Sequence, residues 1–313
     1  MASTQSLGIA VLALFWSAHA VAGEIRQPNV VFLLADDLGW TDLACYGSDL
    51  HETPNLDRLA KEGVRFTRAH AMSVCSPSRA AILTGKHAAR LHITIWREGS
   101  LERTQRAAAS NWPLLDPATA HDLPHAEETI GEALKSAGYL TFHVGKWHLG
   151  DAEHSPETQG FDVNIGGTHW GAPATYFWPF RGPDRSNVLR YVPGLGPGKP
   201  GEYLTDRLTD EALELIDAAG DRPFFLNLWF HNPHYYPTTT PVSAVRAGDW
   251  KLLEYHEDGR VELYNLRDDA GEKLDLSASQ PDRAAKLRES LHAWRKEVGA
   301  QMPTPNPAFQ PKR

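Results

Sequence analysis

The sequence of 313 residues is poor in cysteine and, beyond its N-terminal segment, lacks any apolar run long enough to cross a bilayer. Its two cysteines, Cys45 and Cys75, allow one disulfide, but their spacing does not demand it. A formal net charge of -8 with no basic footprint excludes nucleic acid and anionic membranes as expected partners. These absences leave an ordinary globular protein, long enough for one large domain with a small appendage.

The N-terminal segment has the pattern of a signal peptide. The apolar run Leu7–Trp16 is followed by small residues, and cleavage after Ala20 or Ala22 fits a small-x-small site. Met1–Ser6 contains no lysine or arginine, and an uncleaved buried strand or helix is the alternative interpretation. We predict a signal peptide at residues 1–22, export to the periplasm or the extracellular medium, and no stable membrane anchor.

Buried strands alternate with amphipathic helices along most of the chain. Asn29–Ala35 is a continuous run of β-branched and apolar residues, as expected of a strand that is buried on both faces. This alternation predicts an α/β fold, a largely parallel sheet flanked by helices. Further strands are predicted at Val64–Ala71, Tyr139–Gly145 and Pro223–Phe230, and helices at Thr53–Gly63, Pro77–Leu83, Glu127–Gly138 and Leu204–Ala219.

The pattern changes after about residue 240. Ser243–Leu266 predicts three short antiparallel strands, and Asp282–Val298 predicts an amphipathic helix. These elements form a small α+β unit that is distinct from the parallel sheet. We therefore expect an α/β domain at residues 24–240, an α+β subdomain at residues 241–302 and a disordered tail at residues 303–313.

Polar side chains follow three of the predicted strands directly. In open parallel sheets, ligands bind outside the carboxyl ends of the strands, so side chains at these positions share one rim. The set combines acids, a cation and imidazoles, which are the groups used in acid–base and metal chemistry. Its members are Asp36, Asp37, Lys146, His148, His231 and His234.

Taken one at a time, these motifs have ordinary structural explanations. Asp36 and Asp37 suit a hard cation such as Ca²⁺ or Mg²⁺, but an isolated Asp-Asp pair more often forms a capped turn. Lys146 and the histidines could be solvated loop residues, and Cys75 could be an inert packing cysteine. Three independent strands, however, place such groups at one rim of the sheet. This coincidence argues against a purely structural role for these residues.

Several longer motifs carry a resemblance to the sulfatase family. Cys75-Ser76-Pro77-Ser78-Arg79 with Leu83-Thr84-Gly85 resembles the signature in which a cysteine heads C-x-P-S-R. Gly138–His148 resembles the second signature, and Asn29–Gly47 resembles the opening strand and metal loop. Asn232–Pro237 resembles the later histidine motif. The resemblance runs from Asn29 to Pro237 and resumes at Ala244. It implies an alkaline-phosphatase-like fold, here incomplete, and an arylsulfatase-like sulfuric ester hydrolase.

The resemblance implies a modified nucleophile at Cys75. In this family a formylglycine-generating enzyme oxidises the cysteine to formylglycine, an aldehyde that is hydrated in the resting enzyme. One hydroxyl of the hydrate attacks sulfur and the other later expels sulfate, a form of covalent catalysis that a plain thiol cannot complete. The likeness therefore favours a pre-nucleophile at Cys75 over a packing cysteine.

The resemblance also assigns roles to the polar residues of the rim. Asp36, Asp37 and residue 75 match the ligands of a divalent cation, Ca²⁺ or Mg²⁺, which polarises the sulfate. Arg79 and Lys146 would hold the hydrate and neutralise sulfate charge. The remaining roles fall to histidines, with His148 as the base, His234 protonating the leaving oxygen and His231 as the alternative to His234.

The sequence departs from the family pattern after the Pro-His motif. A long segment that normally supplies more strands, an Asp-Asn pair and a second lysine is missing, and the chain contains no Asp-Asn dipeptide. We expect too few cation ligands, an exposed sheet edge and exposed apolar helix faces.

Three functions remain open on the sequence. They are a sulfatase, an impaired remnant that binds sulfated ligands, and a phosphate or phosphonate ester hydrolase of the same superfamily. Little sulfatase activity is expected. The Cys-x-Pro-Ser-Arg pattern disfavours a simple phosphatase. The aromatic stretch Thr168–Phe180 could form a wall for a sulfated carbohydrate, our expected substrate, or be loop packing.

Overall fold

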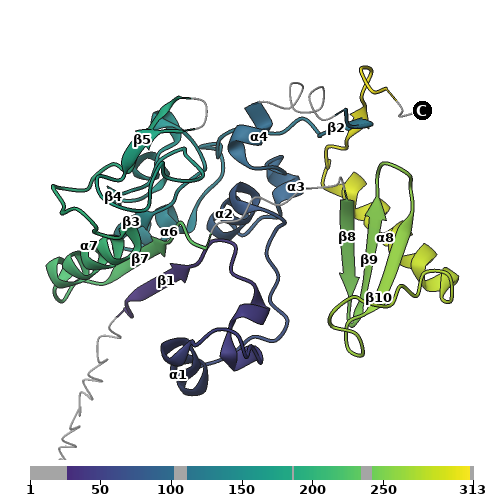
Figure 1. Cartoon of the computed structure of the whole chain (residues 1–313), viewed down its shortest axis with the longest axis horizontal. Helices are drawn as coiled ribbons and strands as arrows, with labels where there is room; N and C mark the ends of the chain where they lie inside the picture. Colours follow the sequence, from purple (N-terminus) through teal and green to yellow (C-terminus); the bar gives the residue numbers. More distant parts are fainter. Residues whose placement is uncertain (1–26, 102–110, 185–186, 234–241, 311–313) are drawn as a thin grey trace, which may run out of the picture.

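A four-stranded parallel sheet forms the centre of the larger part of the molecule (Figure 1). The computed structural model describes residues 27–101, 111–184, 187–233 and 242–310; the predicted signal peptide and His234 lie outside these ranges. The strand order is β1-β7-β3-β4, so the predicted parallel sheet is confirmed. The strands are β1 (Val30–Leu34), β7 (Phe224–Trp229), β3 (Leu140–Gly145) and β4 (Val163–Ile165).

Helices cover the two faces of this sheet unequally. Helix α7 (Leu204–Ala219) lies on the face formed by Phe142, Val144, Leu226 and Leu228. The opposite face packs against α2 (Cys75–Thr84) and a second apolar cluster. A layer of helix on each side of β7 and β3 explains why β7 is buried along its whole length.

Strand β1 is partly buried on one face and exposed on the other, so the prediction of burial on both faces was wrong. Val30, Phe32 and Leu34 pack into the cluster beneath α2, but Val31 is 49% exposed and Leu33 is 53% exposed. The reason is that β1 is the edge strand, and α7 contacts β3 and β7 instead. In the described sheet β1 lies at the edge, as expected, and one of its faces is exposed as well.

Helix α1 (Pro54–Glu62) shows the second expected consequence, an exposed apolar helix face. It lies apart from the sheet in Figure 1, and none of its residues is buried. Leu56 and Leu59 are 42% and 60% exposed. The predicted strand at Val64–Ala71 is absent: this described segment has no strand partner, and its alternating side chains face solvent.

The C-terminal part is a separate three-stranded antiparallel sheet with one helix across it, as predicted. Trp294 of this helix meets the ring of His87 edge-on at 4.6 Å, which joins it to the larger part. Within the tail that was predicted to be disordered, Thr304–Pro305 (β11) pairs with Leu114–Leu115 (β2). The sheet and helix are β8 (Val242–Ala247), β9 (Trp250–Tyr255), β10 (Val261–Asn265) and α8 (Pro281–Glu297).

Short helices, strands and turns complete the described part of the chain. No helix in the part of the chain that the structure describes is apolar and long enough to cross a membrane. The short elements are α3 (Ala88–Leu91), α4 (Arg97–Leu101), α6 (Ile130–Ser136), β5 (Arg181–Pro183), β6 (Leu189–Tyr191) and the 3-10 turns Trp40–Asp42, Ala44–Tyr46, Ala152–His154 and Pro156–Gln159.

Candidate active site

The carboxyl ends of β1, β3 and β7 are held together by backbone hydrogen bonds. The amide of Asp36 donates to the carbonyl of Asn232 at 3.2 Å, and the amide of Lys146 donates to that of Trp229 at 2.7 Å. Gly145 precedes Lys146 with a φ of 101°, and a Cβ there would lie 1.9 Å from the Trp229 carbonyl oxygen. Only glycine permits this approach, which brings the residues after β3 against the end of β7.

Asp36 lies at the centre of a buried charge cluster with Arg79 and Lys146. Its Oδ1 accepts a hydrogen bond from Arg79 Nη2 at 3.0 Å, and its Oδ2 accepts one from Lys146 Nζ at 2.5 Å. Arg79 also donates to the Lys146 carbonyl at 2.7 Å, and its guanidinium lies 4.9 Å from the Trp229 ring centre. All three charged side chains are buried, so the cluster combines one carboxylate with two cations away from water.

The electrostatics of Asp36 follow from this arrangement. Burial by itself raises the pKa of the Asp36 carboxyl, but Arg79 and Lys146 outweigh burial and hold the pKa below its ordinary value. The ionised carboxylate offsets one of the two cationic charges. Within this three-residue cluster, one positive charge remains in excess.

Cys75 stands at the first position of α2 and faces the buried His148. Burial raises the pKa of the Cys75 thiol, but the attraction and hydrogen bond of His148, followed by Lys146, outweigh burial and lower it. Burial lowers the pKa of His148, but Cys75 and Glu98 outweigh burial and raise it. The unmodified thiol therefore lies in an environment that stabilises its anion.

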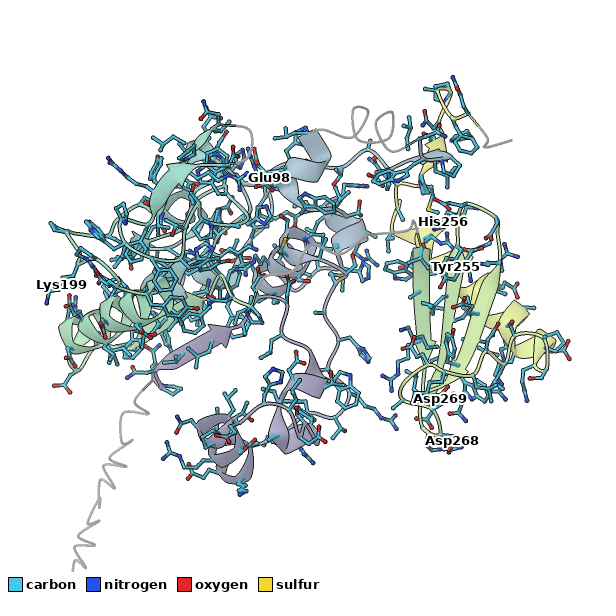
Figure 2. The ribbon with its side chains drawn as sticks, in the orientation of Figure 1. Glu98, Lys199, Tyr255, His256, Asp268 and Asp269 are labelled. Atoms are coloured by element: carbon cyan, nitrogen blue, oxygen red, sulfur yellow. The ribbon has the colours of Figure 1, made fainter. Side chains whose placement is uncertain are left out.

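Glu98 of α4 completes this arrangement behind His148. Its Oε2 lies 2.5 Å from His148 Nε2, and its Oε1 accepts a hydrogen bond from the Gly171 amide at 2.9 Å. Burial raises the pKa of Glu98, but His148 and then the Gly171 amide outweigh burial and hold it far below its usual range. Figure 2 places Glu98 on the side of the molecule that carries the parallel sheet.

Ser76 ties the start of α2 to the loop after β3. Its hydroxyl donates to the carbonyl of His148 at 2.9 Å and accepts from the amide of Arg97 at 3.1 Å. Sequence reasoning missed both Ser76 and Glu98. Ser76 could have been suspected from its place beside Cys75, but no local signal connects Glu98 with a histidine 50 residues away.

The structure brings together five of the residues that the sequence singled out, namely Cys75, Asp36, Arg79, Lys146 and His148. Asp37 has a φ of 59° and an exposed side chain. His231 is buried just beyond β7, next to the rim, and its carbonyl accepts a hydrogen bond from the Tyr176 hydroxyl at 3.2 Å. His234 lies outside the described residues.

The described side chains do not assemble the cation site that was expected at Asp36, Asp37 and Cys75. Both carboxylate oxygens of Asp36 are engaged by Arg79 and Lys146. Within the described ranges, no three acidic, histidine or cysteine side chains come together in a way that could hold a metal ion. Ca²⁺ takes six to eight oxygen ligands, so these residues do not fit it.

The family model and the relatives that match this chain all point to one family. The sequence model of the family described as Sulfatase matches residues 28–274. N-acetylgalactosamine-6-sulfatase of Canis lupus familiaris is 38% identical over 232 residues, which cover 69% of this chain and 41% of that protein. An arylsulfatase of Hemicentrotus pulcherrimus is 34% identical over 268 residues, which cover 79% of this chain and 45% of that protein. The chain thus spans less than half the length of these relatives.

Solved structures agree with the fold. The structure of Ps i-CgsB in complex with k-i-k-neocarrahexaose aligns with a TM-score of 0.65 at 18% identity, over 91% of this chain and 94% of that one. The structure of yidJ from Bacteroides fragilis aligns with a TM-score of 0.63 at 14% identity, over 88% and 97% of the two chains. At these identities the likeness concerns the fold, a parallel sheet flanked by helices with a small antiparallel part.

Proposed function

The chain belongs to the sulfatase family, and we propose that it is a sulfuric ester hydrolase whose nucleophile is made from Cys75. The observation that carries this proposal is the position of Cys75. It opens helix α2 beside His148, and Lys146 and Arg79 supply positive charge to the same rim. A cysteine that only packs in the core has no need of charged side chains around it.

A formylglycine at position 75, once hydrated, supplies one hydroxyl that attacks sulfur and a second that later expels sulfate. The rest of the proposed chemistry belongs to side chains of this site. His148 accepts the proton of the second hydroxyl as sulfate leaves and the aldehyde forms again, and Glu98 stabilises the imidazolium that results. Lys146 and Arg79 neutralise the charge on the sulfate oxygens. The leaving oxygen needs a proton, for which His234 and His231 remain the candidates.

No step of this proposal passes through a divalent cation, because the described residues do not fit one. The excess positive charge on Arg79 and Lys146 supports sulfate binding, but one net charge is a weak substitute for a divalent ion. We therefore expect slow turnover. Binding of sulfated ligands without turnover is the second candidate function, and the engagement of both Asp36 oxygens favours it.

We propose a sulfated carbohydrate as the substrate. Phe177 is 53% exposed, and its ring lies 5.4 Å from that of Tyr203, which forms an aromatic surface suited to a sugar face. Tyr203 is hydrogen-bonded to Asn232, whose carbonyl binds the Asp36 amide, so this surface is connected to the rim. The names of the relatives, an N-acetylgalactosamine-6-sulfatase among them, agree with such a substrate. Export and modification by a formylglycine-generating enzyme belong to the same proposal.

Sulfate release tests the proposal. The full chain is produced together with a formylglycine-generating enzyme and incubated with 4-nitrophenyl sulfate and with a 6-sulfated N-acetylgalactosamine. We expect slow release that is abolished in Cys75→Ala, and equal binding of the sulfated sugar by both proteins. Release that persists in Cys75→Ala would contradict the assigned nucleophile. Binding without release would select the second candidate function.

A further inference from the structure

We propose that Glu98 is a positioning residue that fixes the orientation and the proton-bearing nitrogen of His148. The inference rests on the proposed function for its chemical purpose, since it concerns the histidine that faces residue 75. It assigns a role to a residue outside both sequence signatures. Its structural basis is the contact between the Glu98 carboxylate and the His148 ring, 50 residues apart in the chain.

The carboxylate of Glu98 is held at both oxygens. Oε2 lies 2.5 Å from His148 Nε2, and Oε1 accepts the Gly171 amide at 2.9 Å. The carboxylate therefore cannot rotate without losing a hydrogen bond. A fixed acceptor of this kind determines the direction of the bond that it receives from the imidazole.

Surrounding backbone fixes the ring of His148 from the other sides. A Cβ at position 171 would lie 2.6 Å from the His148 ring carbon Cε1, so glycine is required where the loop passes the ring. The amide of His148 donates to the Thr168 carbonyl at 2.9 Å, and its carbonyl accepts from the Ser76 hydroxyl at 2.9 Å. With φ at 62°, this backbone is locked in a conformation that a non-glycine residue rarely adopts.

This geometry selects one tautomer. An ionised carboxylate only accepts hydrogen bonds, so the His148 nitrogen that contacts Glu98, Nε2, must carry a proton. In the neutral ring the lone pair then resides on Nδ1. Nε2 is committed to Glu98, and Nδ1 is buried with no hydrogen-bond partner among the described residues, so Nδ1 is the nitrogen left to accept a proton. A carboxylate that orients a histidine beside a nucleophile is a recurring device in unrelated enzymes.

The test uses the unmodified protein, so that it does not depend on sulfate hydrolysis. The rate of alkylation of Cys75 by iodoacetamide is measured by peptide mass spectrometry, with Cys45 in the same sample as the internal standard. We expect Glu98→Ala to slow alkylation of Cys75 about tenfold or more, because the thiolate loses its oriented imidazole. Glu98→Gln keeps an oxygen that accepts from Nε2, so its rate of Cys75 alkylation should fall between that of the wild type and that of Glu98→Ala. Cys45 should react equally in all proteins.

Asp122→Asn is the matched control. Asp122 binds Arg97, the residue next to Glu98, at 2.5 Å, so this variant disturbs α4 without touching His148. It should leave the Cys75 rate unchanged, and thermal unfolding checks that each variant folds. Any of three results would overturn the proposal. The rate of Cys75 alkylation could be unchanged in Glu98→Ala, it could fall equally in Glu98→Gln and Glu98→Ala, or it could fall in Asp122→Asn as much as in Glu98→Ala. None of these results bears on whether residue 75 becomes an aldehyde, so failure of the proposed function is detected separately.

Discussion

Asp36 and Lys146 form a buried ion pair, with Oδ2 and Nζ 2.5 Å apart, although 110 residues separate them in the chain. The pair joins the end of the edge strand β1 to the end of β3. Arg79 binds the other oxygen of the same carboxylate. Asp36 therefore serves as the internal counter-ion of two buried cations, where the sequence predicted a cation ligand.

The counter-ion role of Asp36 predicts a large difference between two neighbouring substitutions. Asp36→Asn leaves Arg79 and Lys146 buried without an anion, and we expect the free energy of unfolding to fall by about 3–5 kcal/mol. Asp37→Asn is the control, because that side chain is exposed and a loss below about 1 kcal/mol is expected. Urea denaturation measures both values. Equal stabilities of the two variants would show that Asp36 is not the required counter-ion.

The misfit of the cation site predicts that Ca²⁺ does not stabilise the fold. An ion present at a hundredfold its dissociation constant would add about 2.7 kcal/mol to the free energy of unfolding. We expect the thermal midpoint to stay unchanged when millimolar Ca²⁺ or a chelator is added. Inorganic sulfate should raise the midpoint, since the cluster has excess positive charge. A saturable stabilisation by Ca²⁺ that disappears in Asp36→Asn would contradict this account.

The C-terminal subdomain has its own buried carboxylate, Glu254, which predicts a pH dependence of stability. Arg288 Nε and His292 Nε2 lie 2.6 and 2.8 Å from its Oε1, and Arg295 binds Oε2. Burial raises the pKa of Glu254, but these three partners, Arg295 first, outweigh burial and lower it to about 2 from an ordinary 4.5. A lowered folded-state pKa gives stability that is complete above the unfolded pKa and is lost as pH falls.

We therefore expect Glu254→Gln to lower the free energy of unfolding at neutral pH by about 2–3 kcal/mol, since one pKa unit corresponds to about 1.4 kcal/mol and the half-exposed partners Arg288 and His292 reduce the full value. The difference from the wild type should shrink as pH falls below 4.5 and vanish near pH 2. Chemical denaturation over this pH range measures it. A difference that is independent of pH would mean that packing, and not charge, explains the effect of the substitution.

The open face of β1 predicts self-association. Val31 and Leu33 expose about half of their side chains on an edge strand, where paired edges and apolar patches promote contact between copies. Sedimentation should show a mass that rises with concentration, and Leu33→Lys should reduce it. Leu213→Lys is the control, because Leu213 is 55% exposed on α7, away from this strand. Equal behaviour of wild type and Leu33→Lys would exclude β1 as the associating surface.

Much of the fold was predictable because its signals are local. The apolar periodicity of Leu204–Ala219 gave helix α7 with its observed bounds, and Tyr139–Gly145, which follows a predicted helix, gave β3. The run at Val30–Leu34 gave a strand, but it could not reveal that none of the described helices covers its second face. The alternation at Val64–Ala71 failed because a strand needs a partner, and none of the described strands lies beside it.

The candidate site was predictable where its residues sit in motifs at strand ends. Asp36, Lys146 and His148 were named for that reason, Arg79 was named from the resemblance of its motif to the sulfatase signature, and the four do come together. Glu98 was missed, because its contact with His148 depends on how the loop containing α4 folds back over the rim. The counter-ion role of Asp36 was missed for a similar reason: a sequence shows which charges are present, but not which of them satisfy one another.

The measurement that tests the central claim most directly is mass spectrometry of the peptide that contains residue 75. The protein is co-produced with a formylglycine-generating enzyme, and the peptide that contains Cys45 serves as the unmodified reference. The account predicts an aldehyde or its hydrate at position 75 and an intact thiol at Cys45. A thiol at position 75 in all molecules would contradict the assignment of Cys75 as the precursor of the nucleophile.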